Sequence, residues 1–388
     1  MTVINKKVVA VLYEYFYPGY KAGGPIQSLM NMILTLQDRF EFKIITTAYD
    51  LNETIPYNDV MIDKWNDVQL SPDALPMKVW YASSLKISIG QMRNILHQAS
   101  ADIVFINGLY TQWVNYALLL KKFGLLGKSK LIISPRGMLQ QGALNVKPTK
   151  KKIFLNVFKV AGLFKNVTWH ATTTDEKLDI QQIISTSARI IIAANVPKKP
   201  VSTISFPQKN VKELRLVYLS LITEKKNLLQ LIQVLHTCKY NISLDIYGPV
   251  KEENYWQLCK QKMANLPSNI NINYKGDVKP FMVQATLQQY HALALLTHGE
   301  NFGHALYESL SAARPVITSN FTPWNNLEAN HAGWNCSLDG DERIALVLQQ
   351  IAEMDNTSYA AFCTGAWQLA NNYYNNSDFI NSYSKLFA

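Results

Sequence analysis

The chain has 388 residues, of which 48% are hydrophobic and 17% are charged, and its formal net charge is +10. At about 150 residues per domain, this length predicts two to three domains, and the composition excludes a wholly disordered chain. The net positive charge points to an anionic partner, such as a nucleic acid, an anionic membrane surface or a phosphorylated ligand. The cysteines form no CxxC pair, so neither a disulfide framework nor a cysteine-based zinc site is expected.

The N-terminal sequence predicts a first β-strand rather than a signal peptide. The apolar stretch from Val8 to Leu12 is short, is followed at once by Glu14, and lacks a small-residue cleavage site. No apolar run in the sequence approaches the roughly 20 residues that cross a bilayer as a helix. A cytoplasmic protein is therefore expected.

Strand-like apolar runs alternate with helical patterns through the first half of the chain. Strands are predicted at residues 7–13, 42–46, 101–107, 130–134 and 168–172, and a helix is predicted at 26–36. This alternation is typical of a parallel sheet with helices on both faces.

The positive charge is concentrated between residues 121 and 165. These 45 residues contain no Asp or Glu and eleven basic residues, namely Lys121, Lys122, Lys128, Lys130, Arg136, Lys147, Lys150, Lys151, Lys152, Lys159 and Lys165. From residue 150 to 164, lysines and apolar residues have the spacing of a helix with an apolar stripe and basic flanks. The pattern predicts contact with an anionic membrane surface, and an ordinary helix with a solvated basic face is the alternative. Nucleic acid is not expected as a partner, because no recognised nucleic-acid-binding module appears and the aromatic residues do not alternate with the basic residues in the pattern of a single-strand platform.

The alternation of strands and helices restarts after a Pro- and Lys-rich stretch at residues 195–200, which is interpreted as a hinge. Strands are predicted at 214–219, 243–247, 270–274, 292–296 and 315–318, and helices at 228–235, 254–263 and 305–313. The predicted fold class is α/β, with two doubly wound Rossmann-like domains that face each other across a cleft.

The segment from Glu300 to Thr318 contains the strongest motif. A predicted strand ends near Thr297, and a short loop with Gly303 leads into a helix whose first backbone N–H groups favour an anionic group. Gly303 lets a ligand approach the backbone closely. Glu300 lies in the loop and Glu308 lies more than one turn into the helix, so their carboxylates can accept hydrogen bonds from different parts of one ligand. Two surface glutamates on an ordinary βα unit are the alternative.

The spacing of these two glutamates resembles the E-x7-E signature of retaining glycosyltransferases of family 4, which have the GT-B fold. The resemblance implies that Glu300 lies by the transferred sugar and that Glu308 binds the nucleotide ribose. It also implies that backbone amides of the next four residues contact the sugar and the phosphates, and these residues are Asn301, Phe302, Gly303 and His304.

Two segments of the first half carry the same resemblance. Residues 21–25, which include Gly23 and Gly24, resemble the Gly-rich loop that faces the donor phosphates, with a simple βα turn as the alternative. Residues 134–139 (SPRGML) resemble a motif of one bacterial branch that works on surface polysaccharides. Many relatives have a His near the position of Arg136, which implies an active-site role for Arg136; membership of the basic segment is the alternative.

One position departs from the family pattern. The family usually has an Arg and, five residues later, a Lys that together hold the donor diphosphate; Lys226 matches the Lys, but Leu221 occupies the Arg position. Lys225 and Arg136 are the candidates to compensate. If neither does, the alternative function is a catalytically weak or inactive glycosyltransferase-like scaffold or partner protein.

The resemblance covers residues 8 to about 334 and implies a retaining hexosyltransferase of surface polysaccharide synthesis. The donor would be a UDP- or GDP-linked sugar, and the acceptor a glycan, expected to be lipid-linked. Glu300, Lys226 and Arg136 are the predicted catalytic residues. The predicted donor-binding residues are Gly23, Gly24, Lys225, Asn301, Phe302, Gly303, His304 and Glu308. No cofactor is expected, and no metal either, because the sequence has no His/Cys cluster.

The predicted domains are residues 1–195, which would bind the acceptor, and residues 196–365, which would bind the nucleotide sugar. Residues 366–388 are expected to form a C-terminal helix that packs back on the N-terminal domain. The predicted location is the cytoplasm, with peripheral attachment to the inner face of the cytoplasmic membrane through residues 121–165.

Overall fold

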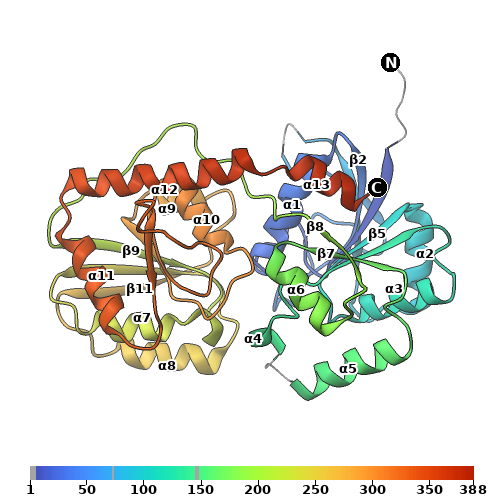
Figure 1. The fold of residues 1–388 in the computed structure, drawn as a ribbon, viewed down its shortest axis with the longest axis horizontal. Coiled ribbons are helices and arrows are strands. Elements are labelled where there is room, and N and C mark those ends of the chain that lie inside the picture. Colours follow the sequence, from blue (N-terminus) through green and yellow to red (C-terminus); the bar gives the residue numbers. More distant parts are fainter. Residues whose placement is uncertain (1–5, 72–73, 145–147) are drawn as a thin grey trace. The chain divides into compact units, whose positions relative to one another are not determined.

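The computed structural model describes residues 6–71, 74–144 and 148–388. The chain forms two compact units: the first runs to Val196 and also includes Asp378–Ala388, and the second is Pro197–Ser377. The chain therefore passes between the units twice (Figure 1). Residue 366, where a domain boundary is predicted, lies inside helix α12 (Asn356–Asn376), which belongs to the second unit.

The first unit is built on a parallel sheet. Within the described residues it has eight strands in the order β3-β4-β2-β1-β5-β6-β7-β8, and β3 is the strand that pairs antiparallel, with β4. The apolar runs of the central strands are buried, as expected for a sheet covered on both faces. The strands are β1 (Lys7–Leu12), β2 (Phe40–Thr47), β3 (Trp65–Val68), β4 (Met77–Ala82), β5 (Ile103–Asn107), β6 (Lys130–Ser134), β7 (Val167–Ala171) and β8 (Arg189–Ile192).

Several helices of the first unit begin at a hydroxyl side chain that accepts a backbone N–H bond. Ser88 forms a capping box with Gln91, and the hydroxyls of Thr111 and Thr173 accept the backbone N–H groups of Val114 and Glu176. The helices of this unit are α1 (Gly24–Leu36), α2 (Ile89–Ala99), α3 (Gln112–Lys122), α4 (Gln141–Leu144), α5 (Pro148–Val160), α6 (Thr174–Ile183) and α13 (Phe379–Leu386).

The C-terminal residues complete the core of the first unit. The ring of Phe387, just after α13, packs edge-on against Phe40, Phe42 and Phe105, with ring centroids 5.3, 6.4 and 5.7 Å apart. Phe387 itself is fully buried. Strands β2 and β5 are thus covered by residues that come from the far end of the sequence.

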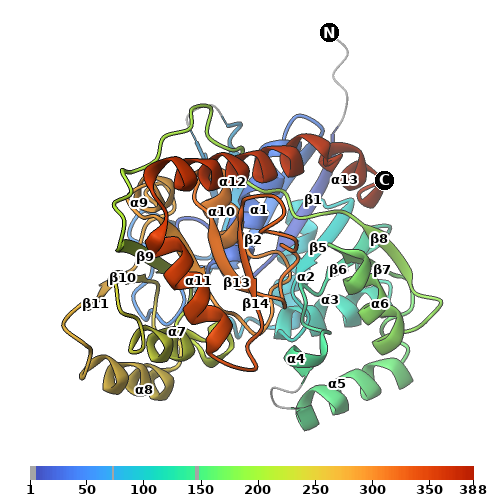
Figure 2. The same ribbon diagram turned by 60° about the vertical axis from the view of Figure 1, so that its left-hand side comes forward.

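The second unit repeats the architecture with a smaller sheet (Figure 2). Its described residues form six parallel strands in the order β11-β10-β9-β12-β13-β14. The strands are β9 (Glu213–Leu219), β10 (Asn241–Tyr247), β11 (Ile270–Gly276), β12 (Ala292–Leu295), β13 (Val316–Ser319) and β14 (Gly333–Cys336). The helices are η1 (Glu224–Lys226, a 3-10 helix), α7 (Leu228–Leu235), α8 (Glu253–Met263), α9 (Val283–Leu287), α10 (His304–Ser311), α11 (Glu342–Glu353) and α12.

The two parallel-sheet units confirm the predicted fold class of two Rossmann-like α/β domains. Among the described residues, no helix has both the length and the apolar character that crossing a bilayer requires.

Helix α12 passes so close to a neighbouring turn that one position has no room for a side chain. A Cβ atom on Gly365 would lie 2.3 Å from the carbonyl oxygen of Asn330 and 2.4 Å from that of His331. Both are backbone atoms, so no side-chain rotation can relieve the overlap. Glycine is therefore needed here although it weakens the interior of a helix.

We expect Gly365→Ala to lower the free energy of unfolding by about 1–3 kcal/mol, despite the higher helix propensity of Ala. Thermal denaturation should show a Tm several degrees lower. The matched control is Gly90→Ala in the exposed first turn of α2, where the nearest atom would be 3.8 Å from the new Cβ. Its Tm should be unchanged or slightly raised. An equal Tm for both variants would contradict the close approach of α12.

Candidate functional site

Two loops meet at the carboxyl edge of the second sheet. Strands β9 and β12 are parallel neighbours, so η1, which follows β9, and the loop of residues 296–303, which follows β12, leave the sheet on the same side. The carbonyl oxygen of Lys225 accepts the backbone N–H of His298 at 2.8 Å and the hydroxyl of Thr297 at 3.2 Å. These bonds join the two loops at the sheet edge where ligands bind in open α/β folds.

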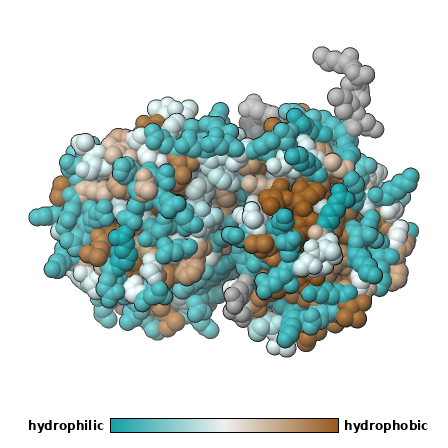
Figure 3. All heavy atoms as spheres, in the orientation of Figure 1, coloured by the Kyte–Doolittle hydropathy of each residue, from teal (hydrophilic) through white to brown (hydrophobic). Residues whose placement is uncertain are grey.

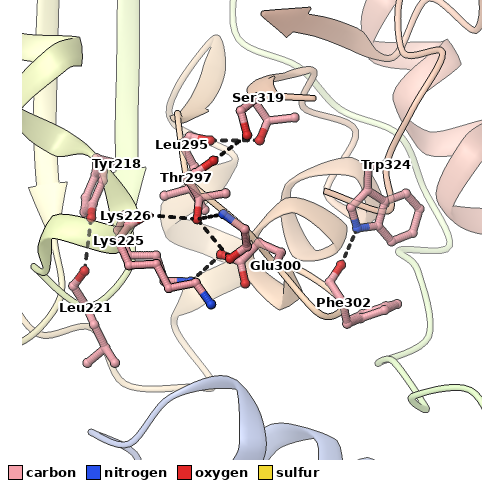
Figure 4. A network of polar contacts seen from close by, with 12 residues as sticks. Tyr218, Leu221, Lys225, Lys226, Leu295, Thr297, Glu300, Phe302, Ser319 and Trp324 are labelled. Atoms are coloured by element: carbon pink, nitrogen blue, oxygen red, sulfur yellow. Dashed lines mark hydrogen bonds and ion pairs between the residues drawn. The ribbon is translucent and has the colours of Figure 1, made fainter. Parts of the chain in front are cut away.

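The joined loops bring Lys225, Lys226 and Glu300 together (Figure 4). The Nζ of Lys226 forms an ion pair with Oε1 of Glu300, and these side chains are only 18% and 13% exposed. Burial lowers the pKa of Lys225, while Glu300 raises it and Lys226 lowers it further. Two ammonium groups therefore share one carboxylate in a partly desolvated position, which leaves a net positive charge suited to phosphate.

Hydrogen bonds connect the Glu300 loop to β13 and to the residues that follow it. The backbone N–H of Glu300 donates to the carbonyl oxygen of Phe321 at 3.1 Å, and the Ser319 hydroxyl donates to the carbonyl oxygen of Thr297. The indole N–H of Trp324 donates to the carbonyl oxygen of Phe302 at 2.6 Å (Figure 4). Trp324 is buried, so it positions the loop rather than meeting a ligand.

Helix α10 begins directly after this loop. Its N-cap is Gly303, which has φ 77° and supplies no side-chain cap. The positive φ of Gly303 favours glycine, and a Cβ there would also lie 2.9 Å from a methyl group of Leu306. Burial raises the pKa of Glu308, in the second turn of α10, to about 7, and the Lys198 ammonium lowers it in part.

Arg136, Gly23 and Gly24 belong to the first unit. Gly23 is the N-cap of α1 with φ 73°, and Gly24 is the first residue of that helix. Arg136 lies in the loop after β6. Its guanidinium donates to Oδ1 of Asn107 at 2.6 Å, to the Ser28 hydroxyl at 3.3 Å and to Oδ1 of Asn195. Arg136 thus connects α1 and β5 to the residues just before the unit boundary, through neutral acceptors.

Within one unit, then, the structure gathers Lys225 and Lys226 with Glu300 and the start of α10. Asn301 and Phe302 precede Gly303 in the loop, and His304 is the first residue of α10. The aromatic ring of Phe302 packs on Trp324 and Tyr307. Gly23, Gly24 and Arg136 lie in the other unit.

Glu176 is a site-supporting residue that the sequence analysis missed. Its buried carboxylate accepts the backbone N–H of Gly137 at 2.6 Å, and the backbone N–H and hydroxyl of Thr172 at 2.7 and 2.6 Å. These bonds fix the SPRGML loop to the start of α6. The T-x-x-E spacing of Thr173 and Glu176 was the signal in the sequence, because it marks a helix start.

His170 supports the same loop from the neighbouring strand β7. Its two ring nitrogens bond to the Ser134 hydroxyl at 2.8 Å and to the carbonyl oxygen of Ala193 at 2.7 Å. Burial lowers the pKa of His170 to about 3, and the positive charge of Arg136 adds to this shift. His170 is therefore a neutral packing residue near pH 7.

A cavity of about 780 Å³ lies beside η1, and acidic side chains are prominent in its lining. Glu224, Glu252, Glu253 and Asp341 contribute carboxylates to it. Its charge is opposite to that of the lysine cluster, so it does not suit a phosphate. Among the residues described, no three His, Cys, Asp or Glu side chains group closely enough to hold a metal ion.

A family comparison matches part of the second unit, which contains the lysine cluster. Residues 202–358 match the family model of glycosyl transferases group 1. The matched region includes η1, the Glu300 loop and α10, and it lies inside the second unit. A search of the curated proteins found no match.

Solved structures resemble the chain over nearly its whole length. Sucrose-phosphate synthase from Thermosynechococcus elongatus has 12% identity and a TM-score of 0.73, with 98% of each chain covered. Anabaena HepE, solved with UDP and glucose, has 13% identity and a TM-score of 0.66, again with 98% of each chain covered. WaaG, a glycosyltransferase involved in lipopolysaccharide biosynthesis, has 14% identity and a TM-score of 0.62 at the same coverage.

The chain has the GT-B fold. At 12–14% identity, the likeness to these structures establishes the fold and leaves the substrate open. The group 1 family match in the second unit and the GT-B fold together support a glycosyltransferase.

The raised pKa of Glu308 predicts a pH-dependent change in stability. This carboxyl titrates near 4.5 when unperturbed and near 7 in the fold, so between these values the folded state binds more protons than the unfolded state. Stability should therefore fall as the pH rises from about 4.5 to about 7, and the loss should persist at higher pH. Glu308→Gln should remove this loss, so its Tm relative to the unaltered protein should rise across that interval.

The measurement is a nucleotide-free thermal denaturation series between pH 5 and pH 8, bracketing most of the titration. Glu328→Gln is the control, because Glu328 is 47% exposed and pairs with Arg343 on the surface. A constant Tm difference between Glu308→Gln and the unaltered protein would show that Glu308 titrates normally.

Proposed function

We propose that the protein is a retaining glycosyltransferase that moves a hexose-type sugar from a UDP- or GDP-linked donor to a glycan acceptor. The observation that carries the proposal is the cluster of Lys225, Lys226 and Glu300 beside the start of α10, inside the region that matches the group 1 family. HepE, which shares the fold, was solved with UDP and glucose.

The chemistry needs positive charge where the leaving group departs. When the bond from the anomeric carbon to the diphosphate breaks, the nucleoside diphosphate keeps the electron pair and gains charge. Lys226, Lys225 and the backbone N–H groups at the start of α10 would stabilise that charge. Since the lysines supply the cationic charge, we propose that the transfer is metal-independent.

Binding of the donor would rearrange the ion pair between Lys226 and Glu300. Before the donor binds, the two side chains neutralise each other. A diphosphate that recruits Lys226 would release Glu300 to accept hydrogen bonds from hydroxyls of the transferred sugar. Glu308 would bind the ribose, and the amides of Asn301, Phe302, Gly303 and His304 would contact the sugar and phosphates.

Leu221 favours the second candidate function, a catalytically weak or inactive scaffold. In the sequence it occupies the position at which the resembled family has a diphosphate-binding Arg, and its carbonyl oxygen accepts the Tyr218 hydroxyl at 3.0 Å. We propose that Lys225 replaces the missing cation, since it lies beside Lys226 and within the field of Glu300. Arg136 is proposed to act in catalysis from the first unit, where its contacts also organise the SPRGML loop.

We further propose that the acceptor is lipid-linked and that the reaction belongs to surface polysaccharide synthesis at the inner face of the cytoplasmic membrane. The basic segment of residues 121–165 supports this, although one of its residues, Lys147, lies outside the described residues. WaaG, which shares the fold, acts in lipopolysaccharide biosynthesis. Nucleic acid is not proposed as a partner.

A thermal-shift panel of UDP, GDP, ADP and their sugar conjugates tests the donor site. A ligand at 100 times its Kd should stabilise the fold by about 2.7 kcal/mol, and we expect this for uridine or guanosine compounds only. Glu308→Ala should abolish most of the shift, and Glu328→Ala, which removes an exposed carboxylate, should keep it. If no nucleotide shifts the Tm of the unaltered protein, the scaffold function is favoured.

Lys226→Gln tests the leaving-group role. Loss of a charge-assisted contact in the transition state should lower turnover about 10- to 100-fold, whereas Lys239→Gln, at an exposed position of the same unit, should leave turnover unchanged. Transfer to an alkyl glycoside is followed by proton NMR, which also reports the anomeric configuration of the product. An inverted product would refute retention, and nucleotide binding without turnover in the unaltered protein would establish the scaffold.

A further inference from the structure

Helix α5 has apolar residues on two opposite faces, and only one of them packs on the first unit. Leu155 is buried, and Phe154 and Phe158 are partly buried against the core of that unit. Ile153, Val157 and Val160 are 58%, 55% and 92% exposed. Their i, i+4, i+7 spacing places these three side chains on one face of the helix. The aromatic members of the predicted stripe therefore face the core, and a second apolar row faces solvent.

The turn after α3 adds two exposed apolar residues near this row. Phe123 is 67% exposed and Leu125 is 45% exposed. The two segments lie side by side, because the Nζ of Lys122 donates to the carbonyl oxygen of Ala161, just after α5, at 2.8 Å. We call the five residues Phe123, Leu125, Ile153, Val157 and Val160 the apolar ridge. In both ribbon views α5 lies at the periphery of its unit (Figures 1 and 2).

Lysines border the apolar ridge on both sides. At about 100° per residue, Lys150 lies on one side of the row on α5, and Lys152 and Lys159 lie on the other. All three are exposed, as are Lys128 and Lys165. The whole segment contains no acidic residue. Hydrophobic and hydrophilic surfaces lie next to each other in the lower right of the space-filling view, where Figure 1 places α5 (Figure 3).

The apolar ridge and its bordering lysines together indicate the chemistry of the partner. Exposed Ile, Val and Phe side chains between lysines match the boundary of an anionic bilayer, where acyl chains lie beneath phosphate groups. A nucleic acid would match the lysines but would leave the apolar ridge without a partner. A neutral surface would match the ridge but would give the lysines no countercharge.

We propose that the apolar ridge inserts into the interface of an anionic bilayer while Lys150, Lys152 and Lys159 bind lipid phosphates. This inference rests on the proposed membrane partner and adds which side chains enter the lipid. It does not depend on sugar transfer. The aromatic residues Phe154 and Phe158 stay in the protein core and anchor the helix from the other side.

The test is co-sedimentation of the full chain with vesicles of phosphatidylglycerol and phosphatidylcholine, compared with phosphatidylcholine alone. The variant Ile153→Ser/Val157→Ser/Val160→Ser should bind the anionic vesicles about tenfold more weakly, because less apolar surface enters the lipid. Ser has nearly the same helix propensity as Ile and Val, so α5 should persist. Leu346→Ser, at a side chain 60% exposed on α11 of the second unit, is the matched control and should bind normally.

A second variant separates charge from insertion. Lys150→Gln/Lys152→Gln/Lys159→Gln should also lose most binding at low salt, whereas Lys64→Gln/Lys86→Gln/Lys239→Gln, at exposed positions elsewhere, should lose much less for the same change in net charge. If the triple Ser variant binds like the unaltered protein, insertion is refuted even though charge-driven binding stands. If the unaltered protein ignores anionic vesicles at low salt, or prefers oligonucleotides, the membrane partner itself is refuted. The nucleotide panel reports on the donor site independently of all these outcomes.

Discussion

The candidate site depends on the two hydrogen bonds that the carbonyl oxygen of Lys225 accepts from the loop after β12. Through them, the loops of two neighbouring strands become one rigid surface. The same bonds set the distance between the lysines of η1 and Glu300. Because backbone and hydroxyl groups form this joint, the charged side chains are left to interact with each other and with a ligand.

In the first unit, the buried carboxylate of Glu176 also fixes a loop in place. Glu176 receives three hydrogen bonds that satisfy its carboxylate away from water, and in return the SPRGML loop is fixed in one conformation. Arg136 then extends from this loop to Asn195. The last residues before the chain leaves the first unit are thus tied to the loop that the sequence singled out, and the tie consists of hydrogen bonds to neutral oxygens.

Periodicity and motif spacing predicted the parallel sheets, strands β9 to β13 of the second unit and the E-x7-E loop, because continuous apolar runs and loop glycines are local signals. Strands β3, β4, β8 and β14 were missed. In β3 (WNDV), polar residues break the apolar pattern. The sequence predicted the helix at α5 with a single apolar stripe, whereas the structure divides its apolar residues between a core side and an exposed side. Two apolar rows on one helix have the same period, and only packing decides which of them becomes the core side. The contacts of Arg136 join residues that are 29 to 108 positions apart, which no local pattern encodes.

The topology of the chain also determines when each unit can complete its core during synthesis. Residues 378–388 belong to the first unit, and Phe387 covers Phe40, Phe42 and Phe105. A ribosome must therefore make the entire second unit before the first can close its core. The second unit is continuous in sequence and can fold as soon as it has emerged from the ribosome. Until residues 378–388 follow, the aromatic side chains of the first sheet remain exposed. During that interval, a chaperone would bind the exposed aromatic surface of the first unit.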